Sequence, residues 1–408
     1  MEHSDQAIKE SNAAPIGTNY KLIVLNSSIS RLGTSGFAVS ILWFALIVTG
    51  SPVLAGFADG MGALPLLLSF AFGAYVDSLS SKKQLAVLAS VIRAVSILSL
   101  FLALRFSNLF IETASIYFVA FVMGLTSDIL NSTTASWTKQ FLLDTQYKRG
   151  TSLMQSTTSL AQSVGYAVAG ALILFGFNFT IYSFAIIFAI SVIPLLLMRN
   201  ETTIKVSGEK SLQSSLINGI RYIFGDKRLR AMIILTLIVN LAFGTVGIFF
   251  AVLVSDQFKL PAIYYTFLFL SLTLGLFFGA ILGAKAKGKA GFYSMTIILA
   301  IGILLFLIGE LRSVYPDYAV SFVMGLLIGI VNVVITTAVV KIVEQEMMGR
   351  VMGAVNTFAI SLTFVSGAIG GVLIRLLTLH GAFFLVGALI AVSAALPLFF
   401  RDFYNLEV

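Results

Sequence analysis

Cysteine is absent from the 408-residue chain, and histidine occurs only twice. Without thiols the protein has no disulfide framework, no thiolate metal site and no iron–sulfur cluster, and two histidines are too few for a histidine-rich metal site. A GxxxxGK(S/T) phosphate loop is also missing, which excludes direct use of ATP. No nucleophile–base pattern can be recognised either. We therefore predict a protein that is not an enzyme and that holds no metal or cofactor.

Charged residues are scarce as well: they make up 11% of the chain, whereas a soluble domain has about 25%. Hydrophobic residues make up 58%, and a helix that crosses a bilayer needs about 20 mostly apolar residues. Twelve such segments can be traced, near residues 21–49, 52–76, 84–104, 113–136, 152–175, 178–198, 231–255, 261–283, 292–310, 317–340, 351–377 and 381–400. A polar stretch separates the first six from the last six, which is typical of two repeated halves. The composition predicts an all-α membrane protein with 12 transmembrane helices in two six-helix bundles.

The apolar segments and the polar stretches between them predict five parts of the chain. These parts are a disordered cytoplasmic tail (1–19), an N-terminal six-helix bundle (20–198), a cytoplasmic linker (199–230), a C-terminal six-helix bundle (231–401) and a cytoplasmic C-terminal tail (402–408). The first nineteen residues lack the basic start and the apolar core of a signal peptide. In the linker, Leu212, Leu216, Ile220 and Ile223 recur at helical spacing, which favours a short amphipathic helix over an irregular linker.

The basic residues lie mostly on one side of the predicted membrane. If the N-terminus is cytoplasmic, twenty of the 26 Lys and Arg residues fall on the cytoplasmic side and four fall outside. This asymmetry follows the positive-inside rule, so both termini are predicted to be cytoplasmic. The net charge of +8 then mostly reflects topology, because no dense basic block indicates a nucleic-acid partner.

The loop after the second segment carries a recognisable motif. It reads GAYVDSLSSKK from Gly73 to Lys83, with Asp77 four residues after the glycine and with Lys82 and Lys83 at its end. This loop resembles the loop 2–3 signature of the major facilitator superfamily. Ser78 stands where that family normally has a basic residue, and the corresponding loop of the second half lacks the acid.

Four further stretches are similar to the macrolide-efflux-like drug:proton antiporters of that superfamily. They are ISRLGTS in the first segment, with Thr34 in place of the usual Asp, SVIRAVSIL around Arg93, NGIRYIF before the seventh segment and EQEMMGRVMGAVN at the eleventh. Tyr166, in the stretch VGYAVAG, replaces the proline that antiporters usually have in the fifth segment. The resemblance covers most of the chain after residue 19.

The resemblance implies the major facilitator fold, in which two pseudo-symmetric six-helix bundles enclose a substrate cavity near mid-membrane and rock to give alternating access. It implies a monomeric secondary transporter of the prokaryotic plasma membrane, with small molecules and protons as partners. The function most directly implied is proton-coupled efflux of amphipathic, drug-like or macrolide-like small molecules. Two alternatives stay open: a transporter of a defined metabolite, siderophore or lysolipid, and a transporter-like receptor that moves no proton.

The residues of the loop signature have a physical role in such a transporter. Asp77 ends the second helix at the cytoplasmic face, where a carboxylate can brace the neighbouring bundle through an ion pair or a helix N-terminus. Gly73 permits close packing of helices. Lys82 and Lys83 either take part in this gate or serve only to anchor the third helix on the cytoplasmic side.

Three charged residues are predicted to lie deep in the membrane at a common level. With a rise of about 1.5 Å per residue, Arg31, Arg93 and Asp128 each lie about 15 Å from a lysine at the cytoplasmic end of their helix. Burying an ionised carboxylate costs roughly 2.5–3.5 kcal/mol even on the gentler scales. Two explanations of Asp128 stay open: a structural ion pair with Arg31 or Arg93, and a protonation switch. One acid beside two arginines also leaves the cavity positive, which leaves room for an anionic or zwitterionic substrate.

A second acid, Asp59, lies in the stretch AGFADGMG, about 12 Å from the outer end of the second helix. Asp59 is either a proton-coupling residue or a solvated residue in an outward-facing funnel. Gly56, Gly60 and Gly62 flank it and form a small-residue face on which a neighbouring helix can pack closely.

Amides, a hydroxyl and aromatic rings complete the predicted substrate cavity: Asn131, Asn240, Asn332, Thr336, Trp43 and Phe243. Asn332 and Thr336 are four residues apart and therefore share one face of a helix. Such amides and hydroxyls either form hydrogen bonds between helices or contact a substrate. The two aromatic rings could stack on a bulky amphipathic substrate.

Overall fold

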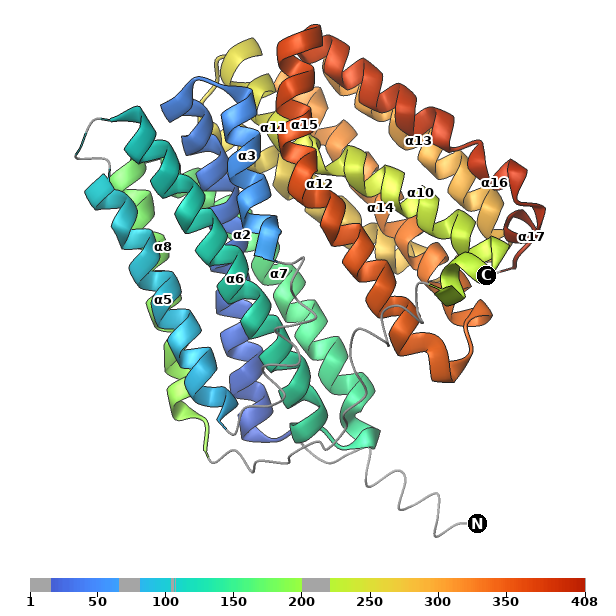
Figure 1. The fold of residues 1–408 in the computed structure, drawn as a ribbon, viewed down its shortest axis with the longest axis horizontal. Helices are drawn as coiled ribbons and strands as arrows, with labels where there is room; N and C mark the ends of the chain where they lie inside the picture. The colour runs from blue at the N-terminus through green and yellow to red at the C-terminus, as the bar shows by residue number, and fades with distance from the viewer. Residues whose placement is uncertain (1–15, 66–80, 104–105, 107, 200–220, 408) are drawn as a thin grey trace.

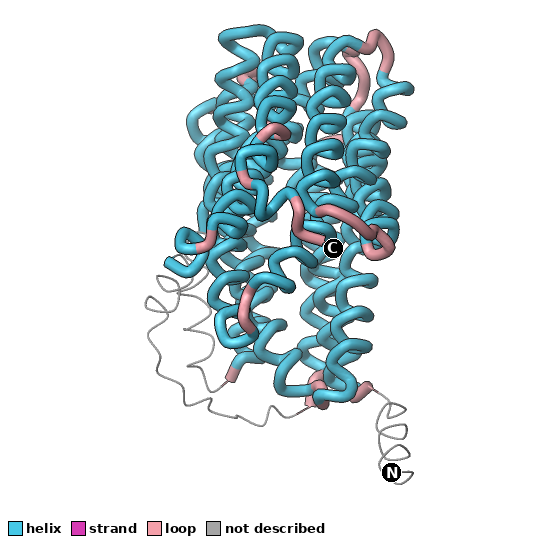
Figure 2. Tube along the Cα trace, turned by 90° about the vertical axis from the view of Figure 1, so that its right-hand side faces the viewer, coloured by secondary structure: helices cyan, strands magenta, loops and turns pink. Residues whose placement is uncertain are grey.

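A computed structural model describes residues 16–65, 81–103, 106, 108–199 and 221–407 (Figure 1). These residues form helices and connecting loops, and no strand is found among them (Figure 2). The N-terminal half forms one bundle of helices. Its elements are α2 (Thr18–Thr49), α3 (Pro52–Ala63), α5 (Lys82–Ala103), α6 (Leu109–Phe141), the 3-10 turn η3 (Asp144–Gln146), α7 (Tyr147–Leu174) and α8 (Phe177–Leu197).

The C-terminal half forms a second bundle beside the first (Figure 1). Its elements are α10 (Lys227–Gly244), α11 (Val246–Val252), the π-helical turn η4 (Leu253–Gln257), α12 (Ala262–Gly283), α13 (Ala290–Glu310), α14 (Val314–Ile342), α15 (Gln345–Ser393), α16 (Leu396–Phe399) and α17 (Arg401–Tyr404). α15 consists of two helices joined at Thr378, whose φ of 67° and ψ of 169° interrupt the helix. This break falls between the predicted eleventh and twelfth segments.

Ten helical segments in the described part of the chain are long and apolar enough to cross a membrane. This number differs from the predicted twelve for two reasons. The described part of the second segment contains only the 12-residue helix α3, because residues 66–80 lie outside the description, and the segment Val365–Phe399 combines the eleventh and twelfth. The all-helical fold is therefore confirmed, and the count of twelve stays a prediction.

The connection between α2 and α3 follows from the residues at the helix ends. Gly50 ends α2 in the left-handed conformation, with φ 58°, and its backbone N–H donates a hydrogen bond to the carbonyl oxygen of Leu46. The Ser51 hydroxyl then accepts a hydrogen bond from the backbone N–H of Leu54 at 3.4 Å, and Pro52 occupies the first helical position. This short connection places α3 directly beside the last turns of α2.

Glycines bring the two bundles into contact at one end of the molecule, which we call the closed end. A Cβ added to Gly56 of α3 would overlap the carbonyl group of Gly367 in α15, so the two backbones touch. Gly371 packs in the same way against the first turn of α3, and Gly170 of α7 packs against Thr266 of α12. The predicted close packing at Gly56 is therefore confirmed. The bundles diverge toward the opposite end, where α2 begins (Figure 1), and we call this the open end.

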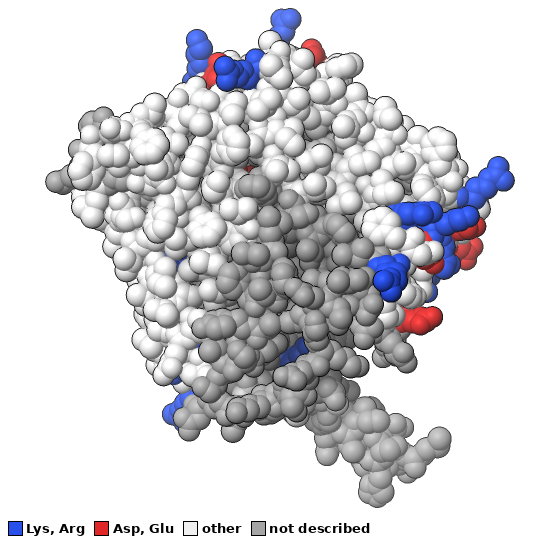
Figure 3. Space-filling view, in the orientation of Figure 1, with Lys and Arg blue, Asp and Glu red and all other residues white. Residues whose placement is uncertain are grey.

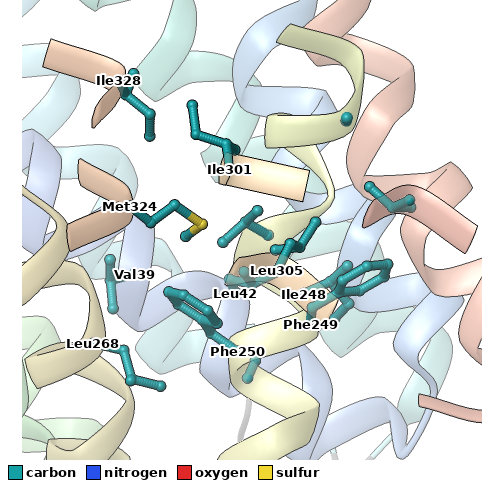
Figure 4. Close-up of a cluster of buried hydrophobic side chains, with 14 of the residues drawn as sticks. Val39, Leu42, Ile248, Phe249, Phe250, Leu268, Ile301, Leu305, Met324 and Ile328 are labelled. Atoms are coloured by element: carbon teal, nitrogen blue, oxygen red, sulfur yellow. The ribbon is translucent and has the colours of Figure 1, made fainter. Parts of the chain in front are cut away.

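A hydrophobic core continues across the contact between the bundles. Figure 4 shows Val39 and Leu42 of α2 in one cluster with Phe250 of α11, Leu305 of α13 and Met324 of α14. All five side chains are at most 5% exposed. In a lipid environment such a cluster is stabilised mainly by van der Waals packing, because lipid is as apolar as the side chains themselves.

Charged side chains on the visible outer surface lie mostly near the ends of the helices. On the face shown in Figure 3, Lys and Arg gather at one rim and around the C-terminus, and the described atoms between them are almost all uncharged. Large hydrophobic side chains are exposed on the outside of both bundles, for example Phe118 (60%), Ile186 (59%) and Val392 (74%). This distribution suits helices whose outer faces contact lipid.

The C-terminal residues pack against the second bundle. Phe403 of α17 is fully buried, and the backbone N–H of Ala290 donates a hydrogen bond to the carbonyl oxygen of Leu406 at 2.7 Å. Lys341, at the end of α14, donates to the carbonyl oxygen of Glu407 at 3.0 Å. The segment predicted as a C-terminal tail therefore joins the ends of α13 and α14.

The other predicted polar parts are only partly described. Residues 1–15 of the N-terminal tail and residues 200–220 of the linker lie outside the described residues. Residues 221–225 are helical, Ile223 is buried, and Asp226 caps α10 by accepting hydrogen bonds from the N–H groups of Arg228 and Leu229.

The backbone contact between α3 and α15 predicts a steric effect. We expect Gly56→Ala to separate the bundles at the closed end, because the added methyl group overlaps the backbone at Gly367. The measurement is the distance between spin labels on cysteines introduced at Leu109 and Tyr315, two exposed positions at the closed ends of α6 and α14. The natural chain has no cysteine that would compete for the label.

Gly62→Ala is the matched control on the same helix. A Cβ at this position lies 3.7 Å from its nearest neighbour, the carbonyl oxygen of Ala120, and so fits. The label distance should lengthen in Gly56→Ala and stay unchanged in Gly62→Ala. Equal distances in the two variants would contradict the proposed role of the glycine contact.

Candidate functional site

Two adjoining cavities lie on the side of the N-terminal bundle. The first has a volume of about 210 Å³, and α2, α5, α6 and α7 contribute its walls. Polar side chains dominate the lining: Asn26, Ser27, Ser30, Arg31, Thr34, Arg93, Ser127, Asn131, Thr134, Gln155 and Thr158. Of the described lining residues only Leu130 and Met154 are apolar, and none is a carboxylate.

The second cavity has a volume of about 250 Å³ and is mostly apolar. It lies between α2, α3 and α6, and side chains such as Phe37, Ile41 and Met123 form its walls. Asp59 is the one acid in its lining. The chemistry of the wall thus changes from polar in the first cavity to apolar in the second.

Four residues line both cavities and make them one continuous site: Arg31, Thr34, Ser127 and Asn131. Arg31 and Asn131 are both exposed. Their helices, α2 and α6, pack against each other, and Ser127 and Asn131 share a face because they are four residues apart. The prediction that Asn131 lines a cavity agrees with this placement.

Arg93 lies behind the wall of the first cavity and is 1% exposed. Its Nη2 donates to the Ser127 hydroxyl at 2.9 Å, its Nη1 to the Thr34 hydroxyl at 3.3 Å and its Nε to the Thr126 hydroxyl at 3.2 Å. The guanidinium also lies 5.0 Å from the centre of the Phe188 ring, which suits a cation–π contact. Hydroxyl groups and a ring, and no carboxylate, therefore surround this buried charge.

Asp128 is 5% exposed and lies on α6 next to Ser127. It forms no ion pair with Arg31 or Arg93, and its Oδ2 has no hydrogen-bond partner. The two arginines both line the first cavity, and their common level in the membrane stays a prediction. The ion pair is not formed, because one step along an α-helix turns the side chain by about 100°, away from the face of Ser127 and Asn131.

Asp59 lies where the second cavity meets the contact between the bundles. Its Oδ2 is 3.4 Å from the position that a Cβ on Gly367 would occupy, so the carboxyl group lies against α15 of the other bundle. It has no hydrogen bond or ion pair with any residue in the described part of the chain. Any movement that separates α3 from α15 therefore changes the surroundings of this carboxyl group.

Aromatic rings close the site toward the closed end. Trp43 stacks on Tyr265 with ring centres 5.6 Å apart, and Phe269 contacts both Tyr265 at 5.3 Å and Tyr166 at 5.4 Å. The Tyr166 hydroxyl accepts a hydrogen bond from Nε2 of Gln162 at 3.0 Å. Trp43 is 7% exposed and lines neither cavity, so its place in the substrate cavity stays a prediction. Its ring packs between the bundles.

The predicted cavity residues of the second bundle line neither of the two cavities. Asn240 is half-buried on α10, and Phe243 is half-buried against the hydrophobic core. Asn332 and Thr336 are exposed on α14 near the open end. Because each residue of an α-helix turns by about 100°, they lie on roughly the opposite side of α14 from Val323, which is also exposed. The two described cavities therefore belong to the N-terminal bundle.

Comparison with known families settles the class of the protein. The model of the Major Facilitator Superfamily matches residues 23–367. The chain belongs to the Major Facilitator Superfamily. It is thus an integral membrane transporter of a family that works by alternating access between two helical bundles.

Individual members of the superfamily resemble this transporter over most of its length. An uncharacterised transporter of this type from Bacillus subtilis (strain 168), YkuC, is 26% identical over 366 residues, which are 83% of this chain and 82% of that protein. The crystal structure of the nucleoside transporter NupG matches 95% of this chain and 99% of its own, with a TM-score of 0.73 at 14% identity. A bacterial homologue of the human lysosomal transporter Spinster, crystallised inward-facing and unoccupied, matches 96% of this chain and 97% of its own, with a TM-score of 0.67 at 10% identity. At these identities the solved structures show the shared fold.

The signature loop of the superfamily is only partly described. Gly73 and Asp77 lie outside the described residues, so their predicted gating role stays a prediction. Lys82 donates a hydrogen bond to the Ser136 hydroxyl, and Lys83 donates to the carbonyl oxygens of Leu196 at 3.0 Å and Met198 at 2.7 Å. Both lysines thus tie α5 to neighbouring parts of the same bundle, as an anchoring role requires, and their part in the gate stays a prediction.

One acid of the second bundle was missed in the sequence. Asp317 is fully buried in the first turn of α14, and neither carboxyl oxygen has a hydrogen-bond partner. Ser321, one turn further along, is also fully buried and its hydroxyl has no partner. The position of Asp317 at the start of a predicted segment suggested a residue at the membrane surface, so its burial could not be read from the pattern. No group of three potential metal ligands occurs among the described residues.

The surroundings of Arg93 predict its contribution to stability. We expect Arg93→Lys to cost about 1–3 kcal/mol, because one ammonium group cannot reproduce the fork that reaches three hydroxyls. The measurement is the midpoint of thermal unfolding in detergent. Arg31→Lys is the control, since Arg31 has no hydrogen bond or ion pair in the described part of the chain. Equal losses of stability in the two variants would contradict the assignment.

Proposed function

We propose that the protein exports amphipathic small molecules across the prokaryotic plasma membrane in exchange for protons. The resemblance of four sequence stretches to macrolide-efflux-like antiporters supports this direction and this coupling. The observation that carries the proposal is the amphipathic lining of the joined cavities. A polar wall with Arg31 continues into an apolar wall with Phe37 and Ile41, so a substrate with a polar and an apolar part matches both.

The direction of access follows from the distribution of basic residues. With both termini in the cytoplasm, the open end faces inward, and the site is reached from the cytoplasm. The closed end, with its glycine contacts and its aromatic rings, then blocks the way to the outside. Export requires the bundles to rock so that the closed end separates and the open end closes.

The carboxyl group of Asp59 is placed to link protons to this motion. An ionised carboxylate is costly to bury in an apolar site, and protonation removes that cost. Asp59 lies at the contact that must break when the outer side opens, so opening brings water to the carboxyl group and closing removes it. Asp128 lies within the N-terminal bundle and experiences this motion less directly.

The test is transport driven by a pH gradient in reconstituted vesicles, across a chemically diverse panel of fluorescent substrates. We expect Asp59→Asn to lose accumulation driven by the gradient while it still carries substrate down a concentration gradient. Because burial of a carboxylate costs about 2.5–3.5 kcal/mol, the gradient-driven rate should fall by about tenfold or more. Asp128→Asn is the control and should keep the response to pH.

Three outcomes would contradict parts of the proposal. An unchanged pH response in Asp59→Asn removes Asp59 from the coupling, and a loss in Asp128→Asn alone assigns the coupling to Asp128. Transport driven by membrane potential alone removes the proton. Binding of substrates without any transport favours a transporter-like receptor.

A further inference from the structure

The guanidinium of Arg31 is free in the wall of the substrate site. Arg31 is exposed, lines both cavities and has no hydrogen bond or ion pair with any residue that the structure describes. An arginine presents five N–H donors in a planar fork that matches a carboxylate or a phosphate. A charged side chain within a membrane is normally paired or hydrogen-bonded. Arg31 can therefore bind an anionic partner, and no described residue of the protein serves as that partner.

The neighbouring groups around Arg31 add donors. The Ser127 hydroxyl accepts a hydrogen bond from Arg93, so its own hydrogen can be donated into the cavity. The side-chain amide of Asn131 is exposed on the next turn of α6 and has no hydrogen bond among the described residues. The Thr34 hydroxyl is already committed, because it donates to the carbonyl oxygen of Ser30 at 2.8 Å. Two neutral hydrogen-bond donors, Ser127 and Asn131, thus line the same cavities as the guanidinium of Arg31.

The charge of this space is positive. Among the residues that the structure describes, the lining of the first cavity contains two arginines and no carboxylate, and hydroxyls and a ring meet the charge of Arg93. Asp128 lies outside the lining and forms no ion pair with either arginine. In a site surrounded by low-dielectric protein and lipid, such a charge attracts anions strongly.

The second cavity determines which part of a ligand lies where. Its walls are mostly apolar, and Asp59, the acid among its described lining residues, lies against α15. The apolar walls favour an uncharged body. The combined volume of the two cavities lies in the lower part of the range that is typical of small-molecule sites, about 300–1,000 Å³.

We propose that the substrate is an amphipathic organic anion whose carboxylate or phosphate group binds at Arg31, with donors from Ser127 and Asn131, and whose apolar body lies in the second cavity. This inference rests on the proposed function in one respect, since it takes the joined cavities as the substrate site. The anion can be a soluble metabolite or a single-chain lipid with an anionic head, because both present the same chemistry to Arg31.

The experiment measures binding to the full-length protein in nanodiscs of neutral lipid, without any ion gradient. The probes are 2-naphthoate, 2-naphthyl phosphate, 2-naphthol and 2-naphthyltrimethylammonium, which share one apolar body. We expect both anions to bind more tightly than the neutral and cationic probes. Arg31→Gln should weaken binding of the anions by about ten- to hundredfold, as for the loss of a hydrogen bond between charged groups, and should leave 2-naphthol unchanged.

Two further variants keep the result interpretable. Arg31→Lys retains the charge and should keep part of the affinity for 2-naphthyl phosphate. Arg375→Gln removes an exposed arginine of α15 outside both cavities and should leave all four affinities unchanged. A preference for the cationic probe, or anion binding that is equal in the natural protein and Arg31→Gln, overturns the inference.

Lysophosphatidic acid is the lipid arm of the same experiment. Tighter binding of lysophosphatidic acid than of 2-naphthyl phosphate to the natural protein indicates a lipid-like anion, and the reverse order indicates a soluble metabolite. Either order supports the inference when Arg31→Gln weakens the binding of both anions, and binding of both that does not depend on Arg31 overturns it. Because these assays use no gradient, a failure of proton coupling at Asp59 leaves them unaffected. Conversely, export of cationic dyes with no effect of Arg31→Gln would refute the anion site and leave proton-coupled export standing.

Discussion

The contact of backbone on backbone between α3 and α15 is the constraint on which the rest of the structure depends. Gly56 and Gly367 let two helices from different bundles approach more closely than any side chain would allow. This approach determines which end of the molecule is closed, and hence on which side the cavities open. It also places Asp59 at the boundary between the bundles rather than inside one of them.

The two bundles contribute unequally to the site. The N-terminal bundle supplies all described residues that line the two cavities, both polar and apolar, whereas the C-terminal bundle supplies Tyr265 and Phe269, two of the rings that close one end. Pseudo-symmetry of the fold therefore does not extend to its chemistry. The two arginines of the site lie in the first half, and the second half supplies the surface against which the first one packs.

The sequence predicted the helical architecture well, because the length and apolarity of a membrane segment are local properties. The constant rise per residue of an α-helix suggested that Arg31 and Arg93 lie near each other, and both line the first cavity. The sequence could not predict the rotation of α6, on which the isolation of Asp128 depends, because rotation is determined by packing against other helices. For the same reason Trp43 was expected in the cavity, although its ring packs against Tyr265 between the bundles. Asp317 was overlooked because its burial results from the tertiary arrangement around the first turn of α14.

The position of the last residues has a consequence for how the molecule is made. Leu406 and Glu407 hold the beginning of α13 and the end of α14 together at the open end. These residues are synthesised after every helix described here, so this part of the second bundle can be completed only once they have left the ribosome. The halves of the transporter can therefore mature in sequence: the first can assemble while the second is still being synthesised, and the second is completed by residues that follow its last helix.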